Sequence, residues 1–227
     1  MPAIQKEQLC SHPADTMNLA IIYQDDHLIA VNKPGGMLSV PGRGADKQDC
    51  VIARLLPHIP EARIVHRLDC HTSGIMLLAV GAEMQRCLSR QFHDREVEKT
   101  YIALVNGTVQ QQSGVIDIPM RADPGNRPVQ VIDSVNGKQA KTRWRLLGHE
   151  RINRSDEVSR LQLHPVTGRT HQLRVHCMAL GHPVVGDRLY NTAAAVEAER
   201  MMLHAQQLEL VHPANNKRLR LVASCGF

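Results

Sequence analysis

The apolar run from Ile75 to Val80 sets the strongest limit on the architecture of this chain. It is short and rich in branched side chains, which is typical of a buried strand. A polar stretch, His66 to Gly74, leads directly into it, so Asp69 should lie in a loop held by a core strand. A carboxylate held there, with a cation two residues before it and hydroxyl groups soon after it, would suit a nucleophile. Asp, Thr, Ser and Gly are also ordinary turn residues, and the spacing by itself favours a plain turn.

The composition limits the class of protein. The 227 residues suit one large domain or two small ones, and 43% hydrophobic with 22% charged residues are normal for a soluble globular protein. The net charge of +5 favours a polyanionic partner such as nucleic acid, although many enzymes reach that charge. Aromatic residues make up only 3% of the chain, which argues against a protein that stacks successive bases on aromatic platforms.

Cysteine usage and hydropathy predict a cytoplasmic protein, and the motif content predicts no cofactor. The six cysteines form no C-x-x-C pair and match no zinc spacing, so we expect free thiols in a reducing compartment. The first 18 residues lack the apolar core of a signal peptide, and no apolar run approaches the roughly 18 residues of a membrane span. The sequence contains no Gly-rich phosphate loop, and the histidines at 171, 176 and 182 have no acid or thiol in matching register. We therefore expect no metal and no organic cofactor.

The remaining patterns predict an α+β fold with a mixed, mostly antiparallel sheet and flanking helices. Strands are predicted over 19–23, 28–31, 97–105, 140–147, 157–163, 203–211 and 219–222, with hairpins at both ends of that series. Helices are predicted over 49–56, 82–95 and 193–200, with a further helix ending at Leu180, and a loop-rich stretch over 114–138. The predicted core stripe of the second helix consists of Met84, Cys87, Leu88, Gln91 and Phe92. Lys141, Arg143 and Arg145 share one face of a strand that is either solvated or in contact with phosphates.

Four stretches resemble the motifs of the RluA-type family of RNA pseudouridine synthases. The most specific is His-Arg-Leu-Asp-x-x-Thr-Ser-Gly at 66–74, and a second long one is Gly-Arg-Thr-His-Gln-Leu-Arg-Val-His at 168–176. Shorter matches are Asn-Lys-Pro-x-Gly at 32–36 and Lys-x-Tyr-x-Ala-x-Val at 99–105, and Leu-His-Ala at 203–205 resembles the closing motif. The resemblance implies a bent sheet crossed by a central active-site cleft. It also implies isomerisation of uridine to pseudouridine within RNA.

The resemblance also implies roles for particular residues. Asp69 would start the reaction, as nucleophile or as base. Tyr101 would pack on the target base, and Arg174 would pair with Asp69 and keep it ionised, as a close guanidinium does. Taken alone, Tyr101 also suits cross-strand packing, and Arg174 suits a helix surface. Further substrate-binding candidates are Arg67, which would help hold the flipped base, and His66, Thr72, Lys33, Arg169 and Leu203.

The expected target is structured RNA. Residues 1–18 form an arm too short for the S4-type domain of many relatives, so residues 19–227 are predicted to be one catalytic domain. That domain resembles the short branch of the family, which includes dual-specificity enzymes acting on position 32 of tRNA anticodon loops and on 23S rRNA. A different tRNA or rRNA target is the first alternative. A glycoside hydrolase with Asp69 as nucleophile and a non-catalytic RNA-binding module are the other two. We expect a monomer without a membrane partner.

Overall fold

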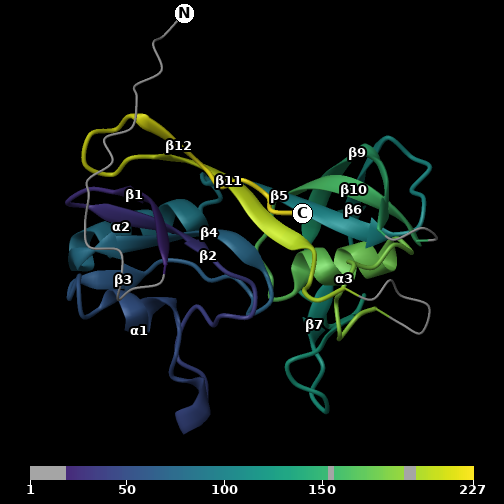
Figure 1. The fold of residues 1–227 in the computed structure, drawn as a ribbon, viewed down its shortest axis with the longest axis horizontal. Helices are drawn as coiled ribbons and strands as arrows, with labels where there is room; N and C mark the ends of the chain where they lie inside the picture. The colour runs from purple at the N-terminus through teal and green to yellow at the C-terminus, as the bar shows by residue number, and fades with distance from the viewer. Residues whose placement is uncertain (1–18, 153–155, 192–197) are drawn as a thin grey trace, which may run out of the picture.

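The computed structural model describes residues 19–152, 156–191 and 198–227. The chain folds around one large sheet (Figure 1). Ten strands of the described residues form this sheet in the order β1-β2-β4-β11-β5-β10-β9-β6, with β12 beside β11 and β3 beside β4, and β7 and β8 pair separately. The elements are β1 (Ala20–Gln24), β2 (Leu28–Lys33), the 3-10 helix η1 (Ala45–Lys47), α1 (Val51–Leu55), β3 (Ala62–Ile64), β4 (Ser73–Val80), α2 (Gly81–His93), β5 (Glu98–Asn106), β6 (Ser113–Asp117), β7 (Met120–Ala122), β8 (Gln130–Ile132), β9 (Lys141–Ile152), β10 (Asp156–Pro165), α3 (Gln172–Ala179), β11 (Leu203–Val211) and β12 (Arg218–Val222).

One half of the sheet contains β1, β2, β3 and β4 and is covered on both faces. Both β2 and β4 are buried along nearly their whole length, so their side chains alternate between two core clusters. Ile29 packs in one cluster with Leu55 of α1, and Leu28 packs in the other with Leu88 of α2. The continuous apolar run at 75–80 is therefore a strand that buries both of its faces.

The other half contains β5, β10, β9 and β6, with α3 packed against it (Figure 1). Thr142, Trp144 and Leu146 of β9 point into the core, whereas Arg143 and Arg145 are exposed. This alternation confirms the predicted strand with a basic outer face. On α3, Leu173 and Cys177 pack into the same core cluster as Trp144. The helix thereby presents its motif residues close to the middle of the sheet.

The two halves meet where β4 and β11 run parallel. The register places Gly74 opposite Ala205, and the two backbones approach very closely. A Cβ on Gly74 would lie 2.2 Å from the carbonyl oxygen of Ala205, and Gly74 has a φ of +108°. Only glycine tolerates both conditions. The glycine of the 66–74 motif therefore fixes the contact between the two halves, five residues from Asp69.

The α+β architecture and the terminal hairpins are confirmed, and two details differ from the sequence-based expectation. The stretch 114–138 contains most of β6 and all of β7 and β8, which are too short to show a clear alternation. Cys87 is exposed rather than part of the core stripe of α2, because only Leu88 of this helix is fully buried. The predicted arm at 1–18 and most of the predicted helix at 193–200 lie outside the described residues.

Two further features concern thiols and membranes. The structure describes five of the six cysteines, and each of these five is a free thiol. Within the described residues, no helix has the length and apolar character needed to cross a membrane.

Candidate active site

Asp69 lies in a tight turn between the two most buried parts of its motif. The turn is closed by the Thr72 N–H, which donates to the Asp69 carbonyl at 3.1 Å. Leu68 before it is buried and is held in both directions by Ser39, whose Oγ donates to the Leu68 carbonyl at 2.7 Å and accepts the Leu68 N–H at 3.1 Å. The side chain of Asp69 stays 25% exposed. The predicted turn is present, and it presents a solvent-accessible carboxylate.

Lys33 stabilises this turn from the protein interior and is not positioned to contact a substrate. Its side chain is fully buried, and its Nζ donates to the carbonyls of Pro34, Met37 and Cys70 at 2.7–2.9 Å. All three ammonium hydrogens are thus used within the protein. Burial lowers the pKa of Lys33 to about 8, against the opposing effect of the charges of Cys70 and Asp69. The expected substrate contact of Lys33 is therefore corrected to a structural role.

Arg174 lies between two carboxylates rather than against Asp69 alone. Its Nη1 is 3.7 Å from Asp69 Oδ2, so the expected ion pair is present but long. Its Nε and Nη2 instead donate to the two carboxylate oxygens of Asp187 at 2.6 and 2.7 Å. The bidentate fork expected on Asp69 is therefore made with Asp187. This leaves one nitrogen of a fixed guanidinium directed to Asp69.

The Arg174–Asp187 pair is almost completely removed from water. The side chain of Arg174 is 4% exposed and that of Asp187 is fully buried. Burial alone would lower the pKa of Arg174, but the hydrogen bonds and charge of Asp187, with the charge of Asp69, raise it overall. Burial alone would raise the pKa of Asp187, and the bonds from Arg174, with the N–H groups of Leu189 and Tyr190, lower it overall. Both groups therefore stay ionised as a pair.

Asp187 was not identified from the sequence. It follows the short buried pair Val184 and Val185, and it accepts the N–H groups of Leu189 and Tyr190 through Oδ1 at 2.9 and 3.2 Å. Gly186 before it has a φ of +73°, and a Cβ there would lie 2.2 Å from the Arg200 carbonyl. The available sequence signal for Asp187 was a glycine followed by an acidic residue, directly after a pair of valines. It is weak, since Gly-Asp is equally common in surface turns.

Tyr101 lies on β5 at the centre of the sheet. Its ring is partly buried and packs against the core clusters of both halves, and its strand neighbours are Leu163 on β10 and Ala205 on β11. Burial raises its pKa, and the charge of Asp69 raises it further. The phenol is therefore neutral near pH 7 and within electrostatic reach of Asp69. The structure thus brings Tyr101, Arg174 and Asp69 together from β5, α3 and the turn before β4.

His66 contacts β4 and α2. Its Nε2 accepts the Leu77 N–H at 2.8 Å, and its ring stacks on Phe92 of α2 with centroids 4.5 Å apart. Burial, with the charge of Lys99, lowers its pKa to about 3, so the imidazole is neutral. His66 is partly buried, and these contacts give it a structural role, while its expected substrate contact stays a prediction. Its hydrogen bond fixes the loop before Asp69 onto β4.

Of the other substrate-binding candidates, two are buried and two are exposed. Thr72 is buried at 3%, and Leu203 is buried at 2% within the core and opposite Ala103. Arg67 and Arg169 are both exposed and available to a large ligand. Arg169 also donates through Nε to the Gln139 carbonyl at 3.2 Å.

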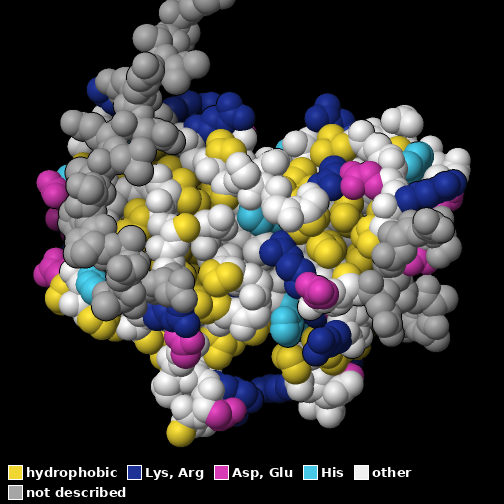
Figure 2. All heavy atoms as spheres, in the orientation of Figure 1, with side chains coloured by type: hydrophobic (Ala, Val, Ile, Leu, Met, Phe, Trp, Pro, Cys, Tyr) yellow, Lys and Arg dark blue, Asp and Glu magenta, His cyan; other side chains and the backbone are white. Residues whose placement is uncertain are grey.

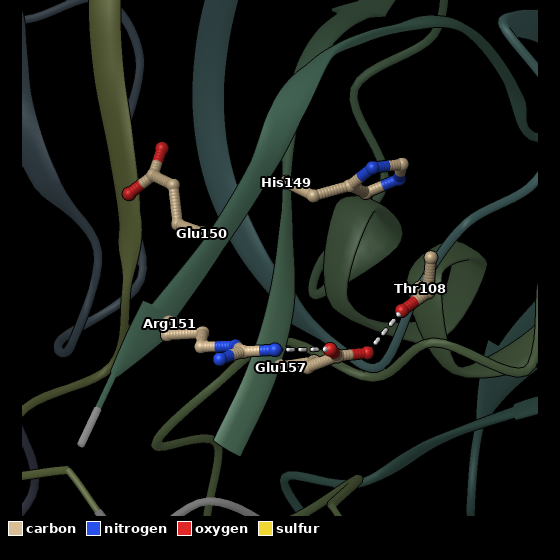
Figure 3. A pocket seen from close by; sticks show the side chains of 5 residues that line it. All are labelled: Thr108, His149, Glu150, Arg151 and Glu157. Carbon is tan, nitrogen blue, oxygen red and sulfur yellow. Dashed lines mark hydrogen bonds and ion pairs between the residues drawn. The ribbon is translucent and has the colours of Figure 1, made fainter. Parts of the chain in front are cut away.

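The face shown in Figure 2 carries Lys and Arg side chains where the two halves of the molecule meet, with acidic and histidine side chains among them. A separate shallow pocket lies near the end of the β9–β10 hairpin and is lined by Thr108, His149, Glu150, Arg151 and Glu157 (Figure 3). Glu157 accepts hydrogen bonds from Thr108 and Arg151 there. None of the motif residues lines that pocket. Over the described ranges, no group of His, Cys, Asp and Glu side chains is arranged to hold a metal ion.

Comparison with known proteins identifies the class. A family model described as RNA pseudouridylate synthase matches residues 27–179. The Escherichia coli (strain K12) protein named dual-specificity RNA pseudouridine synthase RluA is 43% identical over 210 residues, which are 92% of this chain and 94% of that protein. The Yersinia pestis protein of the same name is 45% identical over 196 residues, 86% of this chain and 93% of that protein. The solved structure of human RNA Pseudouridylate Synthase Domain Containing 1 covers 94% of this chain and 86% of its own, with a TM-score of 0.78 and 32% identity.

This chain therefore has an accessible carboxylate beside a buried arginine in a mostly antiparallel α+β fold, and it belongs to the RNA pseudouridine synthase family. Within that family it is of the RluA type, as its motifs indicated. The protein is an isomerase that acts on RNA. A glycoside hydrolase and a non-catalytic RNA-binding module do not agree with this membership.

Proposed function

We propose that this enzyme isomerises uridine to pseudouridine in two kinds of RNA, an anticodon stem-loop of tRNA and a hairpin of 23S rRNA. The support is the similarity over nearly the whole chain to relatives named dual-specificity RNA pseudouridine synthases. A uridine in a structured loop must leave its stack before its glycosidic bond can be reached, which costs a few kcal/mol. The exposed Arg67, two residues before Asp69, is the side chain that we assign to holding the flipped state.

The observation that carries the proposal is the placement of Asp69. It is the carboxylate of the motif that remains accessible, and it faces a guanidinium whose other two nitrogens are held by Asp187. We assign the first step to Asp69, as nucleophile at the sugar or as base. Arg174 stabilises the negative charge that this step requires. Tyr101, a neutral phenol near Asp69, packs on the base.

Residues 19–227 act in this proposal as one catalytic domain, because a single sheet includes strands from Ala20 to Val222. We also propose that the enzyme works as a monomer in the cytoplasm, without a metal or an organic cofactor. The chemistry assigned to Asp69, Tyr101 and Arg174 uses only protein side chains.

The test of the assignment is Asp69→Asn, which keeps the volume of the side chain and removes its charge. The turn should persist, because Asn is as common in turns as Asp. We expect RNA binding to survive and tritium release from C5 of labelled uridine RNA to stop. The matched control is Asp49→Asn, because Asp49 also pairs with an arginine but lies on the surface. Tritium release by Asp69→Asn at a tenth of wild type or more, about 1.4 kcal/mol of lost barrier reduction or less, would refute the role.

The substrate proposal needs a separate experiment. Pseudouridines are mapped in tRNA and 23S rRNA from a strain that lacks this enzyme and from the same strain carrying wild type or Asp69→Asn. We expect anticodon-loop and 23S rRNA sites to be lost and to return only with wild type. If every such site persists in the deletion strain, the targets are other RNAs.

A further inference from the structure

Tyr190 is buried at the junction of the catalytic helix and the β7–β8 ribbon. Its Oη accepts the Gln130 N–H at 2.8 Å and lies 2.7 Å from Nδ1 of His171. Its ring supports Arg174, whose Cζ lies 4.9 Å from the ring centroid. One side chain, itself 4% exposed, therefore contacts the ribbon, the residue before α3 and the arginine that faces Asp69.

The hydrogen bonds of Tyr190 favour one position for the imidazole proton of His171. A tyrosine hydroxyl has a single hydrogen. Because Oη accepts the Gln130 N–H, its own hydrogen is free to be donated to His171 Nδ1. When Oη donates this hydrogen, Nδ1 is the acceptor, and the neutral ring of His171 then carries its own hydrogen on Nε2. Burial also lowers the pKa of His171, which favours this neutral form.

His171 is held in an unusual conformation beside the reacting carboxylate. It has φ 55° and ψ 15°, the left-handed region, immediately before the first residue of α3. Such a conformation is costly for a residue with a Cβ and is often retained at functional sites. His171 is 9% exposed, and the charges of Asp69, Arg174 and Asp187 all act on its ring. The strained backbone thus places an imidazole among the charged groups of the active site.

We propose that Tyr190 and His171 are positioning residues of the active site: the Tyr190 hydroxyl fixes the Nε2–H tautomer of His171, which then supplies a neutral donor on the Asp69 side of the cleft. A neutral donor orients a carboxylate without removing its charge, whereas a charged imidazolium would add a competing cation beside Arg174. This inference rests on the proposed role of Asp69. Neither residue was among the site residues expected from the sequence.

The first test is Tyr190→Phe, which keeps the ring beneath Arg174 and removes only the hydroxyl. We expect kcat for tritium release to fall about fivefold to tenfold, the value of one hydrogen bond, with KM for RNA unchanged. Nitrogen-15 spectra of the wild-type imidazoles should show His171 as the Nε2–H tautomer, and Tyr190→Phe should show a mixture. The control is Tyr23→Phe, because the Tyr23 hydroxyl also donates to a side chain, Asp25 Oδ2 at 2.7 Å, but on β1. It should change neither readout.

The second test is His171→Asn. Asparagine tolerates the left-handed conformation, and its Oδ1 can accept the Tyr190 hydroxyl hydrogen, so only the Nε2–H donor is lost. We expect a normal melting temperature and at least about a tenfold loss of kcat. A wild-type spectrum showing the Nδ1–H tautomer or a charged ring at neutral pH would overturn the inference, and so would unchanged kcat in both variants. The spectrum does not depend on turnover, so it tests the tautomer even if Asp69 has another role.

Discussion

Replacing Asp187 with asparagine should damage both stability and turnover. The change keeps the shape of the side chain but puts a neutral amide against the Arg174 guanidinium. One of the two oxygens that now accept from Arg174 at 2.6 and 2.7 Å becomes an NH₂ group facing a donor. The charge of Arg174 then remains buried, with Asp69 at 3.7 Å as its remaining ionic partner.

The expected loss follows from the burial of the pair. With Arg174 at 4% and Asp187 at 0% side-chain exposure, removal of one charge falls in the class of broken buried ion pairs, which cost about 3–5 kcal/mol. For a chain of this size that corresponds to a fall in Tm of roughly 6–20 °C. Turnover should fall by more than about tenfold at a temperature where the variant is folded, because Arg174 is no longer held toward Asp69.

The assay compares thermal unfolding, urea unfolding and tritium release for Asp187→Asn and Asp49→Asn. Asp49 makes the same bidentate contact with Arg54, at 2.6 and 2.7 Å, but its side chain is 64% exposed. Because exposed ion pairs contribute little, Asp49→Asn should leave Tm and turnover unchanged. Equal effects of the two substitutions would show that burial does not set the energy of the Arg174 pair, and an unaltered Asp187→Asn enzyme would refute the positioning of Arg174.

Three further predictions concern charge. Charge reversal at Arg143 and Arg145 should weaken RNA binding and reduce its salt dependence, because cations that contact phosphates displace counterions; unchanged affinity and salt slope would mean that this face of β9 is only solvated. Lys33 has a folded pKa of about 8, below its unfolded value of 10.5, so the unfolded state holds more protons between these pH values. The unfolding free energy of wild type relative to Lys33→Met should therefore rise with pH across that window, by up to about 1.4 kcal/mol per pH unit, and a flat difference would place Lys33 in solvent. The pKa of His66 is lowered to about 3, so its contribution to stability should be lost as pH falls from about 6.5 toward 3, and His66→Gln should show a shallower pH dependence in denaturant titrations.

The sequence by itself determined the longer strands, the family and the place of the central carboxylate. Apolar periodicity reports which face of an element is buried, so the run at 75–80 and the alternation at 141–146 predicted β4 and β9 correctly. The motif at 66–74 placed Asp69 in a rigid turn before a core strand because its turn residues and glycine act locally. These features depend on neighbours in the chain, which the sequence displays directly.

Only the tertiary structure decided how the polar residues are used. Lys33 and His66 are residue types common on surfaces. Lys33 is buried and His66 is partly buried here, because the fold brings each a backbone partner, the Cys70 carbonyl and the Leu77 N–H. Arg174 was expected to hold Asp69 with its fork, but the loop after α3 brings Asp187 closer. A buried polar group is stable only where partners converge on it, and that convergence depends on how distant segments pack.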